Sequence, residues 1–140
     1  MNAQVRSLCL VALALAATAS QARDYPIGAG WSRAPDLSVY GALRLSSELA
    51  QEREVLCLGH NPASVEDRWR AAYAAREAWI TDALSRRYGS AAVTRAADVK
   101  VGRITCTTFR DDRWRKHHFQ MLRLLEYRLV PRDHWRSSAR

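Results

Sequence analysis

The clearest periodic pattern in the chain lies between Ser64 and Gly89. Apolar and aromatic positions recur there every three or four residues, which is the spacing of one helix face. These positions are Trp69, Ala72, Tyr73, Ile80, Ala83 and Leu84, with Trp79 at the edge. Ser64 is a suitable N-cap, two acids follow it, two arginines end the segment, and Gly89 suits the C-terminal cap. The pattern predicts a helix over residues 65–88.

A second helical spacing follows Asp111 and Asp112, which are suited to capping a helix. The apolar positions that keep this spacing are Trp114, His118, Met121, Leu122, Leu125 and Leu129. A strand over residues 119–130 is the competing interpretation, because several of the same side chains share parity. Gln, Met, Leu, Glu and Arg are good helix formers, so a helix over residues 111–130, ended by Pro131, is favoured.

Two shorter stretches have the composition of strands. Residues 54–59 (EVLCLG) are a short apolar run that ends at a glycine. Residues 98–109 (DVKVGRITCTTF) combine β-branched residues with apolar positions two or three apart. Residues 37–51 fit both a strand and a helix. The sequence therefore predicts a small single α+β domain of strand–helix–strand–helix order, whose strands form a short parallel sheet.

The ends of the predicted domain, which covers residues 37–131, lack this periodicity. Residues 23–36 contain two prolines and two glycines, so we expect an irregular N-terminal arm. Residues 132–140 are expected to form a basic C-terminal tail. No internal repeat and no second domain is predicted.

Residues 1–22 have the composition of a secretory signal peptide. Arg6 is followed by an apolar run from Leu8 to Ala17 and then by small residues that include Ser20 and Ala22. The apolar run is about half of the ~20 residues that a membrane-spanning helix requires. We expect cleavage after Ala22, a periplasmic or secreted protein, and no transmembrane segment after cleavage.

Export determines how the cysteines are interpreted. Cys9 lies within the expected signal peptide, so its removal leaves Cys57 and Cys106. An even number of cysteines in an oxidising compartment indicates disulfide bonding, and two cysteines allow one intramolecular pairing. The sequence therefore predicts a Cys57–Cys106 disulfide, which would join the ends of the two expected strands.

The charge of the chain points to an anionic partner. The sequence has 22 basic and 14 acidic residues, and nine basic residues fall between positions 110 and 140, together with Trp114 and Trp135. Cations interleaved with aromatic rings bind polyanions through phosphate pairing and stacking. The candidate anion-binding residues are Arg113, Arg115, Lys116 and Arg123. The expected polyanions are lipid head groups, lipopolysaccharide phosphates, acidic glycans or stray nucleic acid. The alternative is that these residues form a solvated helix face and tail without a ligand.

A metal site has weaker support. Cys57 and His60, together with His117 or His118, are ligand types that zinc or copper accepts. Cys57 has a better partner in Cys106, so we predict neither a metal site nor a cofactor.

Acid–base catalysis is the next alternative, and His60, His117 and Lys100 are its candidates. No recognised catalytic motif accompanies them, so no catalytic residue is assigned. A small secreted hydrolase that uses His60 and His117 remains an alternative to the leading hypothesis.

An alanine-rich face on the long helix suggests a third function. The alanines are Ala71, Ala72, Ala74, Ala75 and Ala78. They would allow close approach of another element, which suits a structural or partner-docking protein. We expect Trp69, Tyr73 and Trp79 in the core. The leading hypothesis is a non-catalytic, envelope-associated binding protein that is a monomer or weak dimer.

Overall fold

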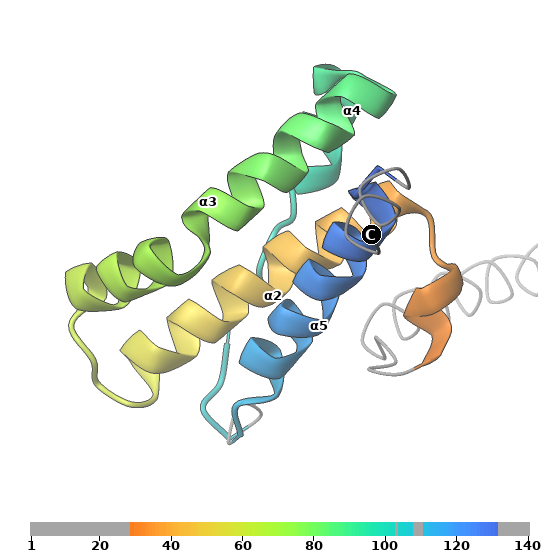
Figure 1. Cartoon of the computed structure of the whole chain (residues 1–140). Coiled ribbons are helices and arrows are strands. Elements are labelled where there is room, and N and C mark those ends of the chain that lie inside the picture. The colour runs from red at the N-terminus through yellow and green to blue at the C-terminus, as the bar shows by residue number, and fades with distance from the viewer. Residues whose placement is uncertain (1–28, 103, 108–110, 132–140) are drawn as a thin grey trace, which may run out of the picture. The chain divides into compact units, whose positions relative to one another are not determined.

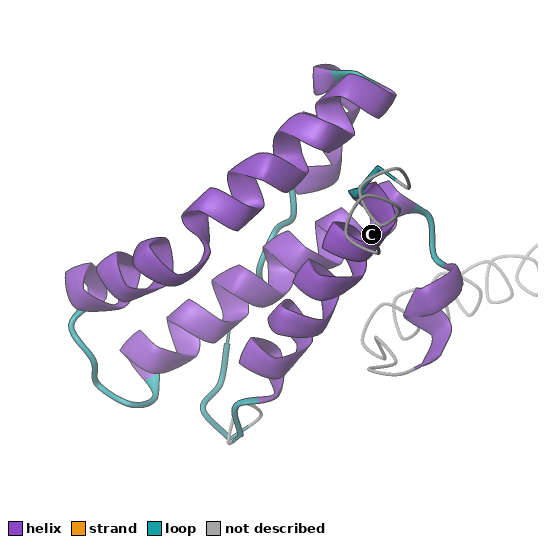
Figure 2. Ribbon diagram, in the orientation of Figure 1, coloured by secondary structure: helices purple, strands orange, loops and turns teal. Residues whose placement is uncertain are grey.

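The structure is a computed structural model that describes residues 29–102, 104–107 and 111–131. The chain divides into two units, Met1–Trp31 and Ser32–Arg140, and the helix bundle belongs to the second unit. The expected signal peptide and C-terminal tail lie outside the described residues. The elements are η1 (Ala29–Arg33), α2 (Asp36–Leu56), α3 (Pro62–Tyr88), α4 (Ser90–Ala97) and α5 (Arg113–Leu129) (Figures 1 and 2).

The three long helices form a bundle around α2. In Figure 1, α2 runs antiparallel to both α3 and α5, and the short α4 turns back at the end of α3. The α4–α5 connection begins at Asp98 and returns along the bundle to the start of α5. The C-terminal end of α2 and the starts of α3 and α5 therefore lie at one end of the bundle, which we call the disulfide end.

The core is built mainly between α2 and α5. Val39 and Leu43 of α2 and Leu122 and Leu125 of α5 are completely buried, and recur at helical spacing. The helix α3 is attached more lightly, because its buried residues are Val65, Ile80 and Leu84. In the part of the chain that the structure describes, no helix is long and apolar enough to span a bilayer.

Local signals explain both ends of α3. The helix begins before the expected Ser64, because the side chain of Asn61 accepts a hydrogen bond from the Ser64 amide at 3.2 Å and Pro62 occupies the first turn. It ends at Tyr88, as predicted. Gly89 follows with φ of 87°, a conformation that favours glycine. The predicted helix over residues 111–130 is also confirmed as α5.

The predicted α+β fold is wrong, because the described residues contain helices and no strand. The ambiguous residues 37–51 are helical, and α2 continues through the first half of the run expected to form the first strand. Leu56 is 61% exposed and Leu58 is 48% exposed. The apolar run thus lies at an exposed helix end rather than inside a sheet.

The second expected strand is a non-helical part of the α4–α5 connection where it is described. Val99 and Val101 are half-buried, whereas Lys100 and Gly102 between and after them are exposed. A period of two therefore reports alternate burial against the bundle. This alternation does not require a neighbouring strand. The expected partner strand is absent, because residues 54–56 are the helical end of α2.

The predicted disulfide is present between Cys57, which caps α2, and Cys106 in the α4–α5 connection. Their Cα atoms are 5.4 Å apart. The bond closes a loop that contains all of α3 and α4. It therefore fixes the α4–α5 connection to the end of α2.

The opposite end of the bundle is held by Asp36, at the start of α2. Its carboxylate accepts hydrogen bonds from Arg87 at 3.2 Å, from the Tyr88 hydroxyl at 2.7 Å and from Arg128 at 3.2 Å. The hydrogen bond to Asp36 raises the pKa of Tyr88, and partial burial and the carboxylate charge act in the same direction. One carboxylate thus joins the ends of α3 and α5 to the start of α2.

Loss of the disulfide should destabilise the bundle. The two cysteines are separated by 49 positions, and closing a loop of this size stabilises a fold by about 4 kcal/mol in the chain-entropy model. We expect the Cys57→Ser/Cys106→Ser variant to lose roughly this free energy of unfolding in urea denaturation monitored by circular dichroism. An unchanged denaturation midpoint would contradict this placement of the bond.

Candidate functional site

The four predicted anion-binding cations occupy exposed positions of α5: Arg113, Arg115, Lys116 and Arg123. Asp111 pairs with Arg113, and Asp112 pairs with both Arg115 at 2.8 Å and Lys116 at 3.1 Å. Hydrogen bonds from Arg115 and Lys116 lower the pKa of Asp112 to about 2. Acids at the start of α5 therefore neutralise much of the predicted basic cluster.

Arg123 differs from the other three, since the described residues place no carboxylate within ion-pair distance of it. Its guanidinium lies 6.0 Å from the centre of the Phe119 ring. Arg76 of α3 approaches the same ring at 5.7 Å and is also held by Glu126, with nitrogen–oxygen distances of 2.6 and 2.8 Å. Two cations thus flank one aromatic ring that is 45% exposed.

Aromatic and basic side chains continue along the seam between α3 and α5. Trp79 is 39% exposed and Tyr127 is 74% exposed. The seam holds two hollows of about 380 and 420 Å³, lined respectively by Phe119 and Lys116 and by Trp79 and Tyr127, among others. We call this surface the aromatic–basic face, and it consists of Tyr73, Arg76, Trp79, Lys116, Phe119, Arg123 and Tyr127.

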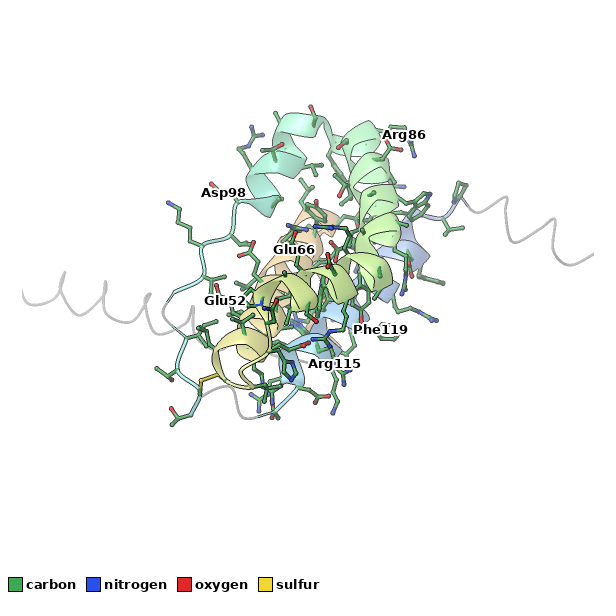
Figure 3. The ribbon with its side chains drawn as sticks, turned by 90° about the vertical axis from the view of Figure 1, so that its left-hand side faces the viewer. Glu52, Glu66, Arg86, Asp98, Arg115 and Phe119 are labelled. Carbon is green, nitrogen blue, oxygen red and sulfur yellow. A yellow bond between two sulfur atoms is a disulfide. The ribbon has the colours of Figure 1, made fainter. Side chains whose placement is uncertain are left out.

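A second basic site lies at the disulfide end, where a cleft of about 270 Å³ opens between three helices. We call it the basic cleft. Its lining residues are Ala50, Arg53 and Glu54 of α2, Leu58 and His60 of the following loop, Arg68 of α3, and Asp112, Trp114 and Arg115 at the start of α5. In Figure 3, Arg115 lies towards the disulfide and Phe119 lies farther along α5. Arg115 lines both the basic cleft and the neighbouring hollow beside Phe119.

Glu54 organises one side of the basic cleft. It accepts a hydrogen bond from Arg68 at 2.6 Å and another from Nδ1 of His60 at 3.2 Å. Partial burial opposes ionisation, but the two hydrogen bonds together with the charges of Arg68 and His60 outweigh it, and the pKa of Glu54 is lowered. The carboxylate is thus ionised near neutral pH and holds both side chains at the cleft.

Of the two adjacent histidines, His118 lies inside the helix bundle and contacts other core side chains. His118 is completely buried, donates from Nε2 to Glu77 at 2.7 Å and packs against the rings of Trp69 and Tyr73. Glu77 also pairs with Arg44 of α2 at 3.2 Å. This junction links α2, α3 and α5. Of the three aromatic residues expected in the core, Trp69 and Tyr73 are half-buried around this junction, whereas Trp79 is exposed.

The histidine pair proposed for hydrolysis is not gathered in one cleft. His60 lines the basic cleft, but His117 is only 2% exposed, lies against Trp114 and is not among the lining residues. Lys100 is exposed and lies outside the cleft lining. Cys57 is held in the disulfide, and no cluster of three or more metal-ligating side chains is found within the described ranges.

Sequence reasoning missed Arg53, Glu54 and Arg68 as site residues. They were missed because residues 54–59 were assigned to a strand, which separated Glu54 from the start of α3. The five alanines proposed for partner docking, Ala71, Ala72, Ala74, Ala75 and Ala78, occupy exposed positions of α3. Comparisons of the chain with protein-family models, with curated proteins and with solved structures find no match.

The burial of His117 should make the stability depend on pH. Burial lowers the pKa of His117, and the neighbouring His118 acts in the same direction. The unfolded chain takes up a proton near pH 6.5, whereas the folded chain resists protonation, so stability is highest above that pH. We expect the free energy of unfolding to fall between pH 7.5 and 5.

Urea denaturation at several pH values, compared between wild type and His117→Leu, measures this contribution. The variant should show a flatter pH dependence, and the exposed-residue variant His60→Gln serves as the control. Identical pH profiles for wild type and His117→Leu would show that His117 is not the group responsible.

Proposed function

We propose that this protein is exported, is cleaved after Ala22, and is a non-catalytic binding protein that contacts an anionic component of the cell envelope. The observation that carries the proposal is the aromatic–basic face. Three of its aromatic rings, those of Trp79, Phe119 and Tyr127, are exposed to solvent, and Arg76 and Arg123 lie beside the Phe119 ring. Large exposed apolar side chains gathered on one face mark interaction sites.

The chemistry of this face matches a lipid surface that carries negative charge. Tryptophan, tyrosine and phenylalanine side chains lie favourably at the boundary between head groups and acyl chains. Lysine and arginine beside them are attracted to anionic head groups. Lys116, Phe119, Arg123 and Tyr127 recur along one side of α5, so they can meet a flat surface together.

Binding is better supported than hydrolysis, because His60 and His117 do not share a cleft. The export part of the proposal is supported by the Cys57–Cys106 bond, since such bonds persist in oxidising compartments.

Vesicle binding tests the proposed function. We expect the protein to sediment with vesicles that contain phosphatidylglycerol, and to be released as salt concentration rises. Each cation near an anionic surface contributes about 1 kcal/mol, so Lys116→Gln/Arg123→Gln should weaken binding by roughly 30-fold. Phe119→Ala should weaken it further by removing apolar contact.

The matched control is Arg95→Gln/Lys100→Gln, which removes the same charge from exposed positions outside the face. It should retain most of the affinity. If both double variants lost the same affinity for vesicles, binding would depend only on net charge, and the aromatic–basic face would not be the binding site. Binding to heparin but not to vesicles would also contradict a lipid partner.

A further inference from the structure

We propose that the basic cleft is a second binding site, separate from the aromatic–basic face, and that it takes a phosphate monoester. Arg53, Arg68 and Arg115 reach the cleft from α2, α3 and α5 respectively. These three helices meet at the disulfide end, so the arginines that line the cleft belong to three different elements. This inference does not rest on the lipid-binding function proposed above.

The cleft offers hydrogen-bond donors that its own acids do not use. Arg68 contacts Glu54 through Nη2, and Arg115 contacts Asp112 through Nη2. A guanidinium has five N–H donors, so each of these side chains keeps several for a ligand. The two side chains are also 57% and 59% exposed, which leaves those donors accessible.

The acids orient the arginines without cancelling the charge of the cleft. Glu54 and Asp112 both have lowered pKa values and are ionised near neutral pH, and the lining of the cleft combines these two carboxylates with three arginines. Because the carboxylates already restrain Arg68 and Arg115, less side-chain freedom is lost when a ligand binds. The remaining positive charge favours an anion.

The number of arginines that line the cleft favours phosphate over carboxylate. A phosphate monoester has three terminal oxygens, and guanidinium groups bind such oxygens in a bidentate manner. Three arginines from three helices match three oxygens, whereas a carboxylate offers two oxygens in one plane. Phosphate therefore uses more of the available donors.

The remaining walls suit a small organic substituent. Trp114 and Leu58 provide apolar surface beside the arginines. The cleft volume of about 270 Å³ lies just below the usual range of ~300–1,000 Å³ for ligand pockets, so the ligand must be small. A soluble ester such as glycerol phosphate and the head group of a phosphatidic acid share this chemistry.

Calorimetric titration with glycerol phosphate tests the site. We expect saturable binding at one site per chain. The variant Arg68→Gln removes charge-assisted hydrogen bonds and should weaken binding by roughly tenfold or more. The matched control is Arg70→Gln, because Arg70 is also exposed on α3 and pairs with Glu66 but lies outside the cleft lining. Its affinity should equal that of wild type.

Two further measurements distinguish a soluble ester from a lipid head group as the ligand, and the basic cleft from the aromatic–basic face as the binding site. If the natural ligand is the head group of phosphatidic acid, Arg68→Gln should weaken binding to phosphatidic acid vesicles more than it weakens binding to phosphatidylglycerol vesicles. An equal loss of affinity for the two kinds of vesicle would assign the cleft to soluble phosphate esters. Lys116→Gln/Arg123→Gln should still bind glycerol phosphate, so failure of vesicle binding leaves this site standing. Circular dichroism confirms that each variant is folded. The site is overturned if glycerol phosphate does not saturate, if Arg68→Gln binds like wild type, or if Arg70→Gln loses as much.

Discussion

The covalent bond between Cys57 and Cys106 is the constraint on which the disulfide end depends. The α4–α5 connection has no helix in its described residues, so its own backbone does not determine where α5 begins. The bond ties this connection to the cap of α2, and Asp112, Trp114 and Arg115 follow shortly after it. The basic cleft is thus assembled where a covalent link, rather than regular structure, sets the chain's path.

Polar contacts join the three long helices at points away from the disulfide end. Glu77 contacts His118 of α5 and Arg44 of α2 in the middle of the bundle, and Asp36 binds the far ends of α3 and α5. Replacing one partner of such a buried or half-buried contact leaves the other unsatisfied, which is costly in a protein interior. Because α3 has few buried apolar residues, these contacts matter most for its position. Its outer surface stays free to carry the aromatic–basic face.

The sequence predicted elements whose signals are local and missed those that depend on neighbours. Periodicity and caps identified the helices that end at Tyr88 and begin near Arg113, and the cysteine count identified the disulfide. An apolar run in residues 54–59 and a period of two in residues 98–109 predicted strands. Both patterns indicate which side chains are buried, and neither indicates that the segment pairs with another strand. The candidate cations were placed correctly on α5, but their pairing with Asp111 and Asp112, and the role of Glu54, depend on the packing of helices.

The most direct test of this account is the affinity for glycerol phosphate before and after reduction of the Cys57–Cys106 bond. It is measured at a temperature where circular dichroism shows that the helices are retained. If the bond holds Arg115 and Trp114 against α2, the reduced protein should bind much more weakly while staying helical. Unchanged affinity in the reduced, helical protein would contradict the claim that this bond assembles the cleft.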